Sequence, residues 1–198
     1  MYYSVVSRLK RTHLRFMSIS PGQPVNPLLD LVLTSKSEAH VFGGDAVAIE
    51  DLDNDPLVME GQLLSRLLDE SRRELLIGID PGSRIGLAVF YGGRELGGTT
   101  SNSVDGTVGA VAKLVEEVPH SSLCVKIGAG EPRSSQLLAR ALRDRLPSAS
   151  IEIVDESGTS QGRRGAAGGN RDQRAAARIA FRKGNRLATL ARSKKTVE

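Results

Sequence analysis

Three acidic residues of this 198-residue chain stand at positions suited to chemistry: Asp80, Glu156 and Asp172. Asp80 ends an apolar run, Glu156 follows another, and Asp172 opens a helix-like segment. Strand ends and helix starts of this kind meet at one edge of a sheet, so we expect the three carboxylates to lie together. Oxygen ligands hold Mg²⁺ (or Mn²⁺), and one or two such ions activate water and stabilise the leaving oxygen of a phosphodiester. We predict that these acids are both the metal ligands and the catalytic residues.

Two of these acids also have a plain structural interpretation. Asp80 precedes Pro81-Gly82, and aspartate is common before such a turn. Asp172 in a first helical turn could satisfy free amides and complement the helix dipole. Capping does not explain the acids together, and Asp172 shares the inward stripe of its helix, where an uncompensated charge is costly. Glu131, just past a predicted strand at 123–127, is the alternative middle ligand.

A basic segment accompanies the acids at the end of the chain. Residues 161–198 contain eleven Lys or Arg and two acidic residues, a balance of +9, whereas the whole chain carries +4 and the remainder therefore −5. Such asymmetry is typical of a protein with a polyanionic partner, nucleic acid foremost. The alternative is a solvated tail, which fits residues 192–195 best. We predict that phosphates are contacted by the arginines around Asp172: Arg163, Arg164, Arg171, Arg174 and Arg178.

The elements that must position these residues begin at residue 75. Apolar runs predict five strands, at 75–80, 85–91, 94–101, 123–127 and 151–154, and amphipathic stripes predict helices at 105–118, 134–146 and 172–182. Asp-Pro-Gly and Gly-Gly turns make the first three strands an antiparallel meander. The first, fourth and fifth strands should run parallel through right-handed crossovers. The predicted fold is α/β, a mixed five-stranded sheet (βββαβαβα) flanked by helices.

A small N-terminal α/β unit, to which the sequence assigns no role, precedes this sheet. We expect a helix at 2–14, strands at 14–19 and 31–34, an irregular acidic loop after Ser35 and a linking helix at 60–73. The loop holds three alternating aspartates but lacks the glycine and closing glutamate of a calcium loop. The predicted division of the chain is 1–60, 61–74, 75–184 and a basic tail at 185–198.

Composition limits the compartment and the partners. The one cysteine, Cys124, excludes an internal disulfide and a multi-cysteine zinc site, and it suits a reducing compartment. No apolar run reaches membrane-spanning length, and the start of the chain lacks the apolar core of a secretory signal. We therefore expect a cytoplasmic protein with no membrane partner. The first acid is Asp30, so an organellar transit peptide is the alternative, although ordered-looking sequence begins at once.

Three motifs resemble the RuvC/YqgF branch of the ribonuclease H-like superfamily, which includes Holliday junction resolvases and pre-16S rRNA nucleases. Residues 77–82 (Ile-Gly-Ile-Asp-Pro-Gly), followed by Gly86-Leu87-Ala88, look like its first motif. Residues 154–160 resemble the Asp-Glu-Arg-Leu-Ser/Thr-Thr motif, and Asp172 with residues 174–180 resembles the last motif, an Asp that opens an Ala-rich helix. The resemblance implies a ribonuclease H-like sheet and Mg²⁺-dependent hydrolysis of structured nucleic acid, either junction DNA or precursor rRNA.

This resemblance covers about residues 75–182 and has three departures. The resolvases carry a glutamate in the fourth strand, where this chain has Lys126, and a second helix acid, where it has Ala175. In the YqgF motif an arginine follows the glutamate, where this chain has Ser157. The rival to an endonuclease is therefore a nucleic-acid-binding protein that keeps the fold without the chemistry. Cutting both strands of a symmetric junction would require a homodimer. An actin-like ATPase would need a second similar domain, for which too few residues remain.

Overall fold

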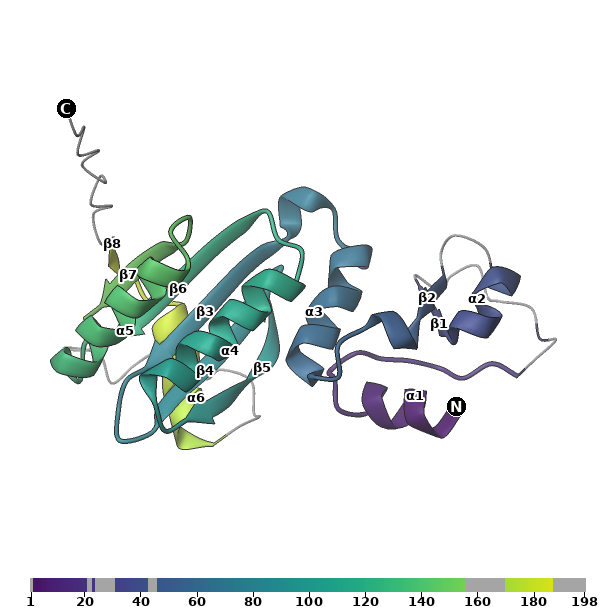
Figure 1. Cartoon of the computed structure of the whole chain (residues 1–198), viewed down its shortest axis with the longest axis horizontal. Helices are drawn as coiled ribbons and strands as arrows, with labels where there is room; N and C mark the ends of the chain where they lie inside the picture. Colours follow the sequence, from purple (N-terminus) through teal and green to yellow (C-terminus); the bar gives the residue numbers. More distant parts are fainter. Residues whose placement is uncertain (1, 21–22, 24–30, 43–45, 156–169, 187–198) are drawn as a thin grey trace, which may run out of the picture.

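A sheet with helices on both faces forms the larger part of the computed structural model (Figure 1). The structure describes residues 2–20, 23, 31–42, 46–155 and 170–186. The sheet order is β5-β4-β3-β6-β7-β8, in which β3, β6 and β7 are parallel. The five predicted strands and the central place of residues 75–80 are confirmed, and a two-residue sixth strand is added. The strands are β3 (Glu74–Asp80), β4 (Ile85–Tyr91), β5 (Arg94–Ser101), β6 (Ser122–Gly128), β7 (Ser150–Val154) and β8 (Asn185–Arg186).

Three helices cover the two faces of this sheet. The helices α4 (Val104–Glu117) and α5 (Pro132–Arg145) lie on one face, and α6 (Arg171–Ala180) lies on the other (Figure 1). The main apolar core fills the α4/α5 side, whereas the α6 side is packed chiefly by alanines and Phe90. The predicted helices are confirmed with shifted ends. The helix predicted from residue 105 starts at Val104, because the Ser103 side chain caps it by accepting a hydrogen bond from Gly106 N.

The connection between β4 and β5 is the predicted two-residue hairpin. Gly92 and Gly93 have φ values of +56° and +79°, which glycine adopts without the steric cost that other residues meet. In the pairing of these strands Gly86 of β4 faces Asp80 of β3 and Thr100 of β5, and the β4–β5 register shifts between Val89 and Phe90. That register decides which residues surround Asp80.

The N-terminal unit contains a parallel pair of short strands and three helices, and it differs in detail from the prediction. The first helix stops at Leu9 rather than 14, because a tight turn closes on it through Thr12, whose amide and hydroxyl both donate to Leu9 O. Residues 14–19 form no strand, since no neighbouring strand pairs with them. The elements are α1 (Tyr2–Leu9), β1 (Val32–Thr34), α2 (Lys36–Phe42), β2 (Ala46–Ala48), a 3₁₀ turn η2 (Ile49–Asp51) and α3 (Pro56–Leu67).

The described residues of the segment predicted as an irregular acidic loop form α2, β2 and η2, and the aspartates at 51, 53 and 55 make contacts within the chain. Asp51 pairs with Lys36, and Asp53 accepts a hydrogen bond from Lys113 Nζ at 2.8 Å. Asp55 caps α3, which therefore starts at Pro56 and not at residue 60. Burial acts to raise the pKa of Asp53, but the hydrogen bonds that it accepts lower that pKa overall. In the described part of the chain, no helix has both the length and the apolar character needed to cross a bilayer.

Candidate metal and nucleic-acid site

Asp80 lies at the C-terminal end of the central strand, on the face that α6 covers. Along β3, Leu75, Ile77 and Ile79 are fully buried in the α4/α5 core. Alternate residues of a strand point to opposite faces. Asp80 therefore shares the α6 face with Gly78, and its side chain is half-buried at the sheet edge. This placement is the one predicted for the first catalytic acid.

Asp172 lies against the same spot, reached through Gly86. Gly86 is the cross-strand partner of Asp80, and a Cβ built on Gly86 would lie 3.1 Å from Asp172 Cβ and 2.3 Å from Asp172 O. The β-carbons of opposite residues in an antiparallel pair are about 5 Å apart and on the same face, so those of Asp80 and Asp172 lie within about 9 Å of each other. The structure thus brings two of the three predicted acids together.

Small residues allow α6 to lie this close to the sheet. A Cβ on Gly78 would come within 2.1 Å of Ala176 O, so helix backbone rests directly on strand backbone at this point. Glycine in a strand commonly marks such an approach. On the helix side, Ala176, Ala177 and Ala180 are buried. The Ala-rich sequence of α6 is therefore the counterpart of the glycines in β3 and β4.

The first turn of α6 is capped by other residues, which leaves Asp172 available. The Asn170 side chain accepts from Gln173 N, and Gln173 Oε1 accepts from Asn170 N, a complete capping box. Gln173 Nε2 also donates to Gly98 O at 3.0 Å, which fixes the turn against β5. The side-chain cap of α6 is therefore Asn170 and not Asp172, which lies in the first helical turn. Its side chain is one-third exposed at 32%.

Arg84, in the turn after Asp80, is a site residue that the sequence analysis missed. Its Nε lies 4.0 Å from Asp172 Oδ2, and its Nη2 donates to Thr100 Oγ1 at 2.8 Å. Asp172 has no basic neighbour on its own helical stripe, as predicted, but Arg84 reaches it from the β3–β4 turn. The sequence feature that could have identified Arg84 is its position in the turn that directly follows Asp80.

Glu131, the alternative middle ligand, is the N-cap residue of α5. Its side chain caps α5 and accepts from Ser134 N at 2.7 Å. Hydrogen bonding to Ser134 lowers the pKa of Glu131. This capping favours Glu156 as the third acid. Glu156 lies outside the described residues, as do Arg163 and Arg164, and the described residues contain no group of three His, Cys, Asp or Glu that could hold a metal.

Lys126 occupies the strand position where the resolvases carry a glutamate. Its Nζ donates to Arg182 O at 2.6 Å and lies 3.7 Å from Glu152 Oε2 on β7. Both side chains are largely buried, at 16% and 13% exposed. A cation near the last carbonyls of a helix complements its dipole. Lys126 thus anchors the end of α6, and β6 supplies no acid to the site at this position.

The predicted row of arginines is present on the free side of α6. Arg171, Arg174 and Arg178 are exposed, at a spacing that places them along one side of the helix. They flank Asp172 and face away from the buried alanines. The helix that brings an acid to Asp80 therefore also presents three guanidinium groups to solvent. The chain matches no protein-family model and no curated protein.

Proposed function

We propose that this protein is a metal-dependent endonuclease of the ribonuclease H-like type, which hydrolyses phosphodiester bonds in structured nucleic acid. The observation that carries the proposal is the placement of Asp80 beside Asp172 at the end of the central strand. The two carboxylates come from distant parts of the chain. Neither the close contact with Gly86 nor the capping box of α6 requires an acidic side chain at position 172. The substrate class is junction DNA or precursor rRNA, as the resemblance implies.

The donor set fits a hard divalent cation. Mg²⁺ is usually held by one or two carboxylates, while waters and substrate phosphates fill the remaining positions. Asp80 and Asp172 supply such a pair at a partly exposed edge, and Glu156 is the proposed third ligand. The bound metal would supply an activated water and stabilise the leaving oxygen. Arg84 offsets the repulsion between the two carboxylates and lies within reach of a phosphate bound there.

The arginines of α6 fit the same partner. A row of exposed guanidinium groups binds phosphates and carries no base code, so it suits recognition of a shape rather than a sequence. Arg171, Arg174 and Arg178 would hold the backbone on either side of the scissile phosphate. Arg163 and Arg164, near them in the sequence, are proposed to extend this contact.

A second candidate is a nucleic-acid-binding protein without catalysis. The observation that favours it is Lys126, a structural anchor at the position where the related resolvases use an acid. A protein of this kind would have the same fold and the same row of arginines on α6 as the proposed nuclease. The two candidates differ only in whether the carboxylates bind metal and support cleavage.

The test is Asp80→Asn, which keeps the size of the side chain and removes its charge. We expect cleavage of labelled junction DNA and structured RNA in Mg²⁺ or Mn²⁺ to be abolished, with binding largely retained. Because one charge of a repelling pair is removed, the metal-free protein should melt at the same temperature or higher. Addition of Mg²⁺ should raise the melting temperature of the wild type and not of the variant.

The matched control is Glu131→Gln, which removes a carboxylate charge near the same sheet edge. This variant should keep both cleavage and the response to Mg²⁺. If Asp80→Asn instead loses stability without metal and responds to Mg²⁺ like the wild type, Asp80 is a turn residue and the binding protein is the better assignment.

A further inference from the structure

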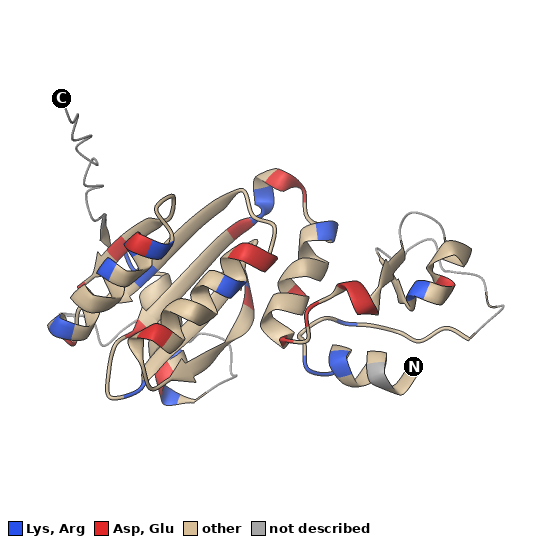
Figure 2. Ribbon diagram, viewed as in Figure 1, with Lys and Arg blue, Asp and Glu red and all other residues tan. Residues whose placement is uncertain are grey.

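The start of the chain carries basic side chains that form no ion pair within the described residues. Arg8 is engaged, since it donates to the carbonyls of Ile49 and Leu52. By contrast, the side chains of Lys10, Arg11 and Arg15 are exposed and make no hydrogen bond or ion pair with other described residues. Figure 2 shows Lys and Arg but no Asp or Glu on α1 and the segment that follows it. Three cations are thus free to bind an external anion.

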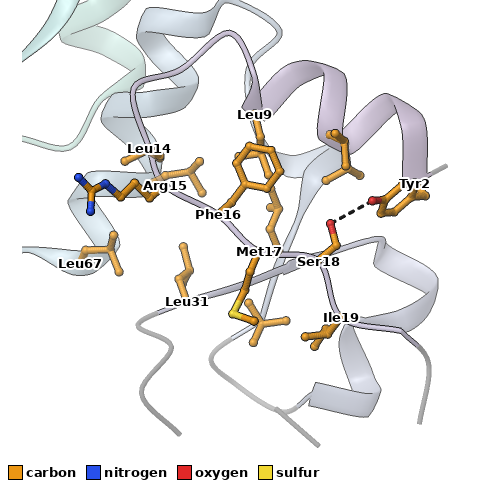
Figure 3. Close-up of a pocket in the computed structure, with 15 residues that line it drawn as sticks. Tyr2, Leu9, Leu14, Arg15, Phe16, Met17, Ser18, Ile19, Leu31 and Leu67 are labelled. Atoms are coloured by element: carbon orange, nitrogen blue, oxygen red, sulfur yellow. Dashed lines mark hydrogen bonds between the residues drawn. The ribbon is translucent and has the colours of Figure 1, made fainter. Parts of the chain in front are cut away.

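Exposed aromatic side chains lie in the same segment. Tyr3 is 86% exposed, Tyr2 57% and Phe16 41%, although the whole chain has only seven aromatic residues. Tyr2 and Phe16 also line a cavity of about 280 Å³, with Arg15 at one side (Figure 3). Contiguous exposed apolar patches on a protein surface often mark an interaction site. Aromatic rings interleaved with cations are the side chains that bind single-stranded nucleic acid, by stacking on its bases and pairing with its phosphates.

A groove with a volume of about 860 Å³ lies between this segment, β5 and the first turn of α6. Its lining includes Arg11 and His13, Arg94 and Gly97 of β5, and Gln173. Gln173 is the neighbour of Asp172 in the first turn of α6. The backbone amide of His13 donates to Glu60 Oε2 at 3.0 Å, and Glu60 is buried, which fixes this wall of the groove.

Two acids, Asp55 and Glu95, also line the groove. The Asp55 carboxylate accepts a hydrogen bond from Leu57 N as the cap of α3. Burial raises the pKa of Glu95. Arg11 and Arg94, by contrast, have no side-chain partner among the described residues.

We propose that the N-terminal unit binds a single-stranded stretch of nucleic acid and passes it along this groove toward Asp80 and Asp172. Unpaired bases stack on Tyr2, Tyr3 and Phe16, and phosphates pair with the three free cations. The claim that the nucleic acid leads to Asp80 and Asp172 rests on the proposed function. The claim that the N-terminal surface binds it does not. A membrane surface would also accept a basic helix with aromatic residues. The groove, which joins Arg11 and Arg94 to Gln173, the residue next to Asp172, favours nucleic acid.

The first test compares two triple variants with equal changes in charge. Lys10→Gln/Arg11→Gln/Arg15→Gln removes the proposed contacts, and Arg133→Gln/Arg140→Gln/Arg143→Gln removes three cations from α5 on the opposite face of the sheet. Both are made in the full chain with Asp80→Asn and assayed without metal, by fluorescence anisotropy of labelled DNA and RNA oligomers of about 16 nucleotides. We expect the first to weaken binding at least about tenfold and to flatten the log–log salt slope by about 2, since each phosphate contact contributes about 0.7. The control should change the affinity less than about twofold.

The second test examines stacking. Tyr3→Ala removes an exposed ring, so the fold should be unaffected, and the affinity should fall at least about fivefold. The chain has no tryptophan, and Tyr91 is buried with its hydroxyl on Pro119 O. Quenching of tyrosine fluorescence by an oligomer would therefore report on Tyr2 and Tyr3. Circular dichroism and melting temperatures check that each variant is folded.

Three results would overturn the inference: equal losses for the two triple variants, unchanged binding and quenching with Tyr3→Ala, or tighter binding to anionic lipid vesicles than to any oligomer. All binding is measured without metal, so a failure to detect cleavage in the wild type would refute the nuclease and leave this surface standing. Normal cleavage by the wild type together with normal binding by the N-terminal variants would refute this surface alone.

Discussion

Gly86→Ala tests the contact on which the candidate site depends. The added methyl would lie 2.3 Å from Asp172 O and 2.5 Å from Asp172 C, which are helix backbone atoms that cannot rotate away. Overpacking costs about 1–3 kcal/mol, and a rigid obstacle places this case near 3. Alanine in place of a strand glycine returns about 0.5–1 kcal/mol. Gly86 does not have a positive φ, so backbone strain adds nothing.

The expected net loss is therefore about 2 kcal/mol in the free energy of unfolding, measured by urea denaturation, or a fall in Tm of about 4–8 °C for a chain of this size. Displacement of α6 should also lower any metal-dependent cleavage, because the two carboxylates move apart. The matched control is Gly109→Ala in α4, where a Cβ would have nothing within 4 Å. An alanine there should stabilise the helix by about 0.5–1 kcal/mol.

The diagnostic result is a lower free energy of unfolding for Gly86→Ala and a higher one for Gly109→Ala. If Gly86→Ala unfolds at the same urea concentration as the wild type or higher, while Gly109→Ala is stabilised as expected, then α6 does not rest on Gly86. The inferred closeness of Asp80 and Asp172 would be lost with it.

Two further predictions concern residues that flank the site. Lys126→Met removes the ion pair between Lys126 and the largely buried Glu152, so urea denaturation should show a loss of about 2–4 kcal/mol, and the double variant Lys126→Met/Glu152→Gln should recover much of it. No recovery would mean that Lys126 acts only through Arg182 O. Glu131→Gln should destabilise the protein at neutral pH, because the folded-state pKa of Glu131 is lowered and its contribution is fully present above the unfolded value. The difference from wild type in thermal melts should shrink only as the pH falls below about 4, through the folded pKa, and a constant difference from pH 7 to 3 would contradict this.

Much of the sheet could be predicted because its signals are local. Alternating apolar residues and the Gly92-Gly93 turn specify β3 to β5 without reference to distant residues. The elements α2 and β2 were missed because they are short and stand in a polar stretch with no clear period. The start of α3 could have been found, since Asp55 before Pro56 is a typical cap and first helical residue.

The candidate site was only partly predictable. Asp80 and Asp172 could be assigned to one sheet edge from strand ends and helix starts. Their closeness depends on the register that sets Gly86 opposite Asp80, and on α6 resting against that glycine, which no local pattern encodes. The cap formed by Asn170 and Gln173, which frees Asp172, was visible in the sequence and was not used. The contact of Arg84 with Asp172 required the three-dimensional arrangement.

The position of α6 along the chain has a consequence for protein synthesis. The ribosome releases β3 to β7 before this helix, so an incomplete chain can form the strands that present Asp80 while Asp172 is still missing. The arginines of α6 arrive on the same helix and at the same moment. An unfinished or truncated chain would therefore lack both the second carboxylate and this part of the proposed phosphate contact. Under the proposed function, the nascent protein remains inactive toward the RNA around it until α6 has folded onto the sheet.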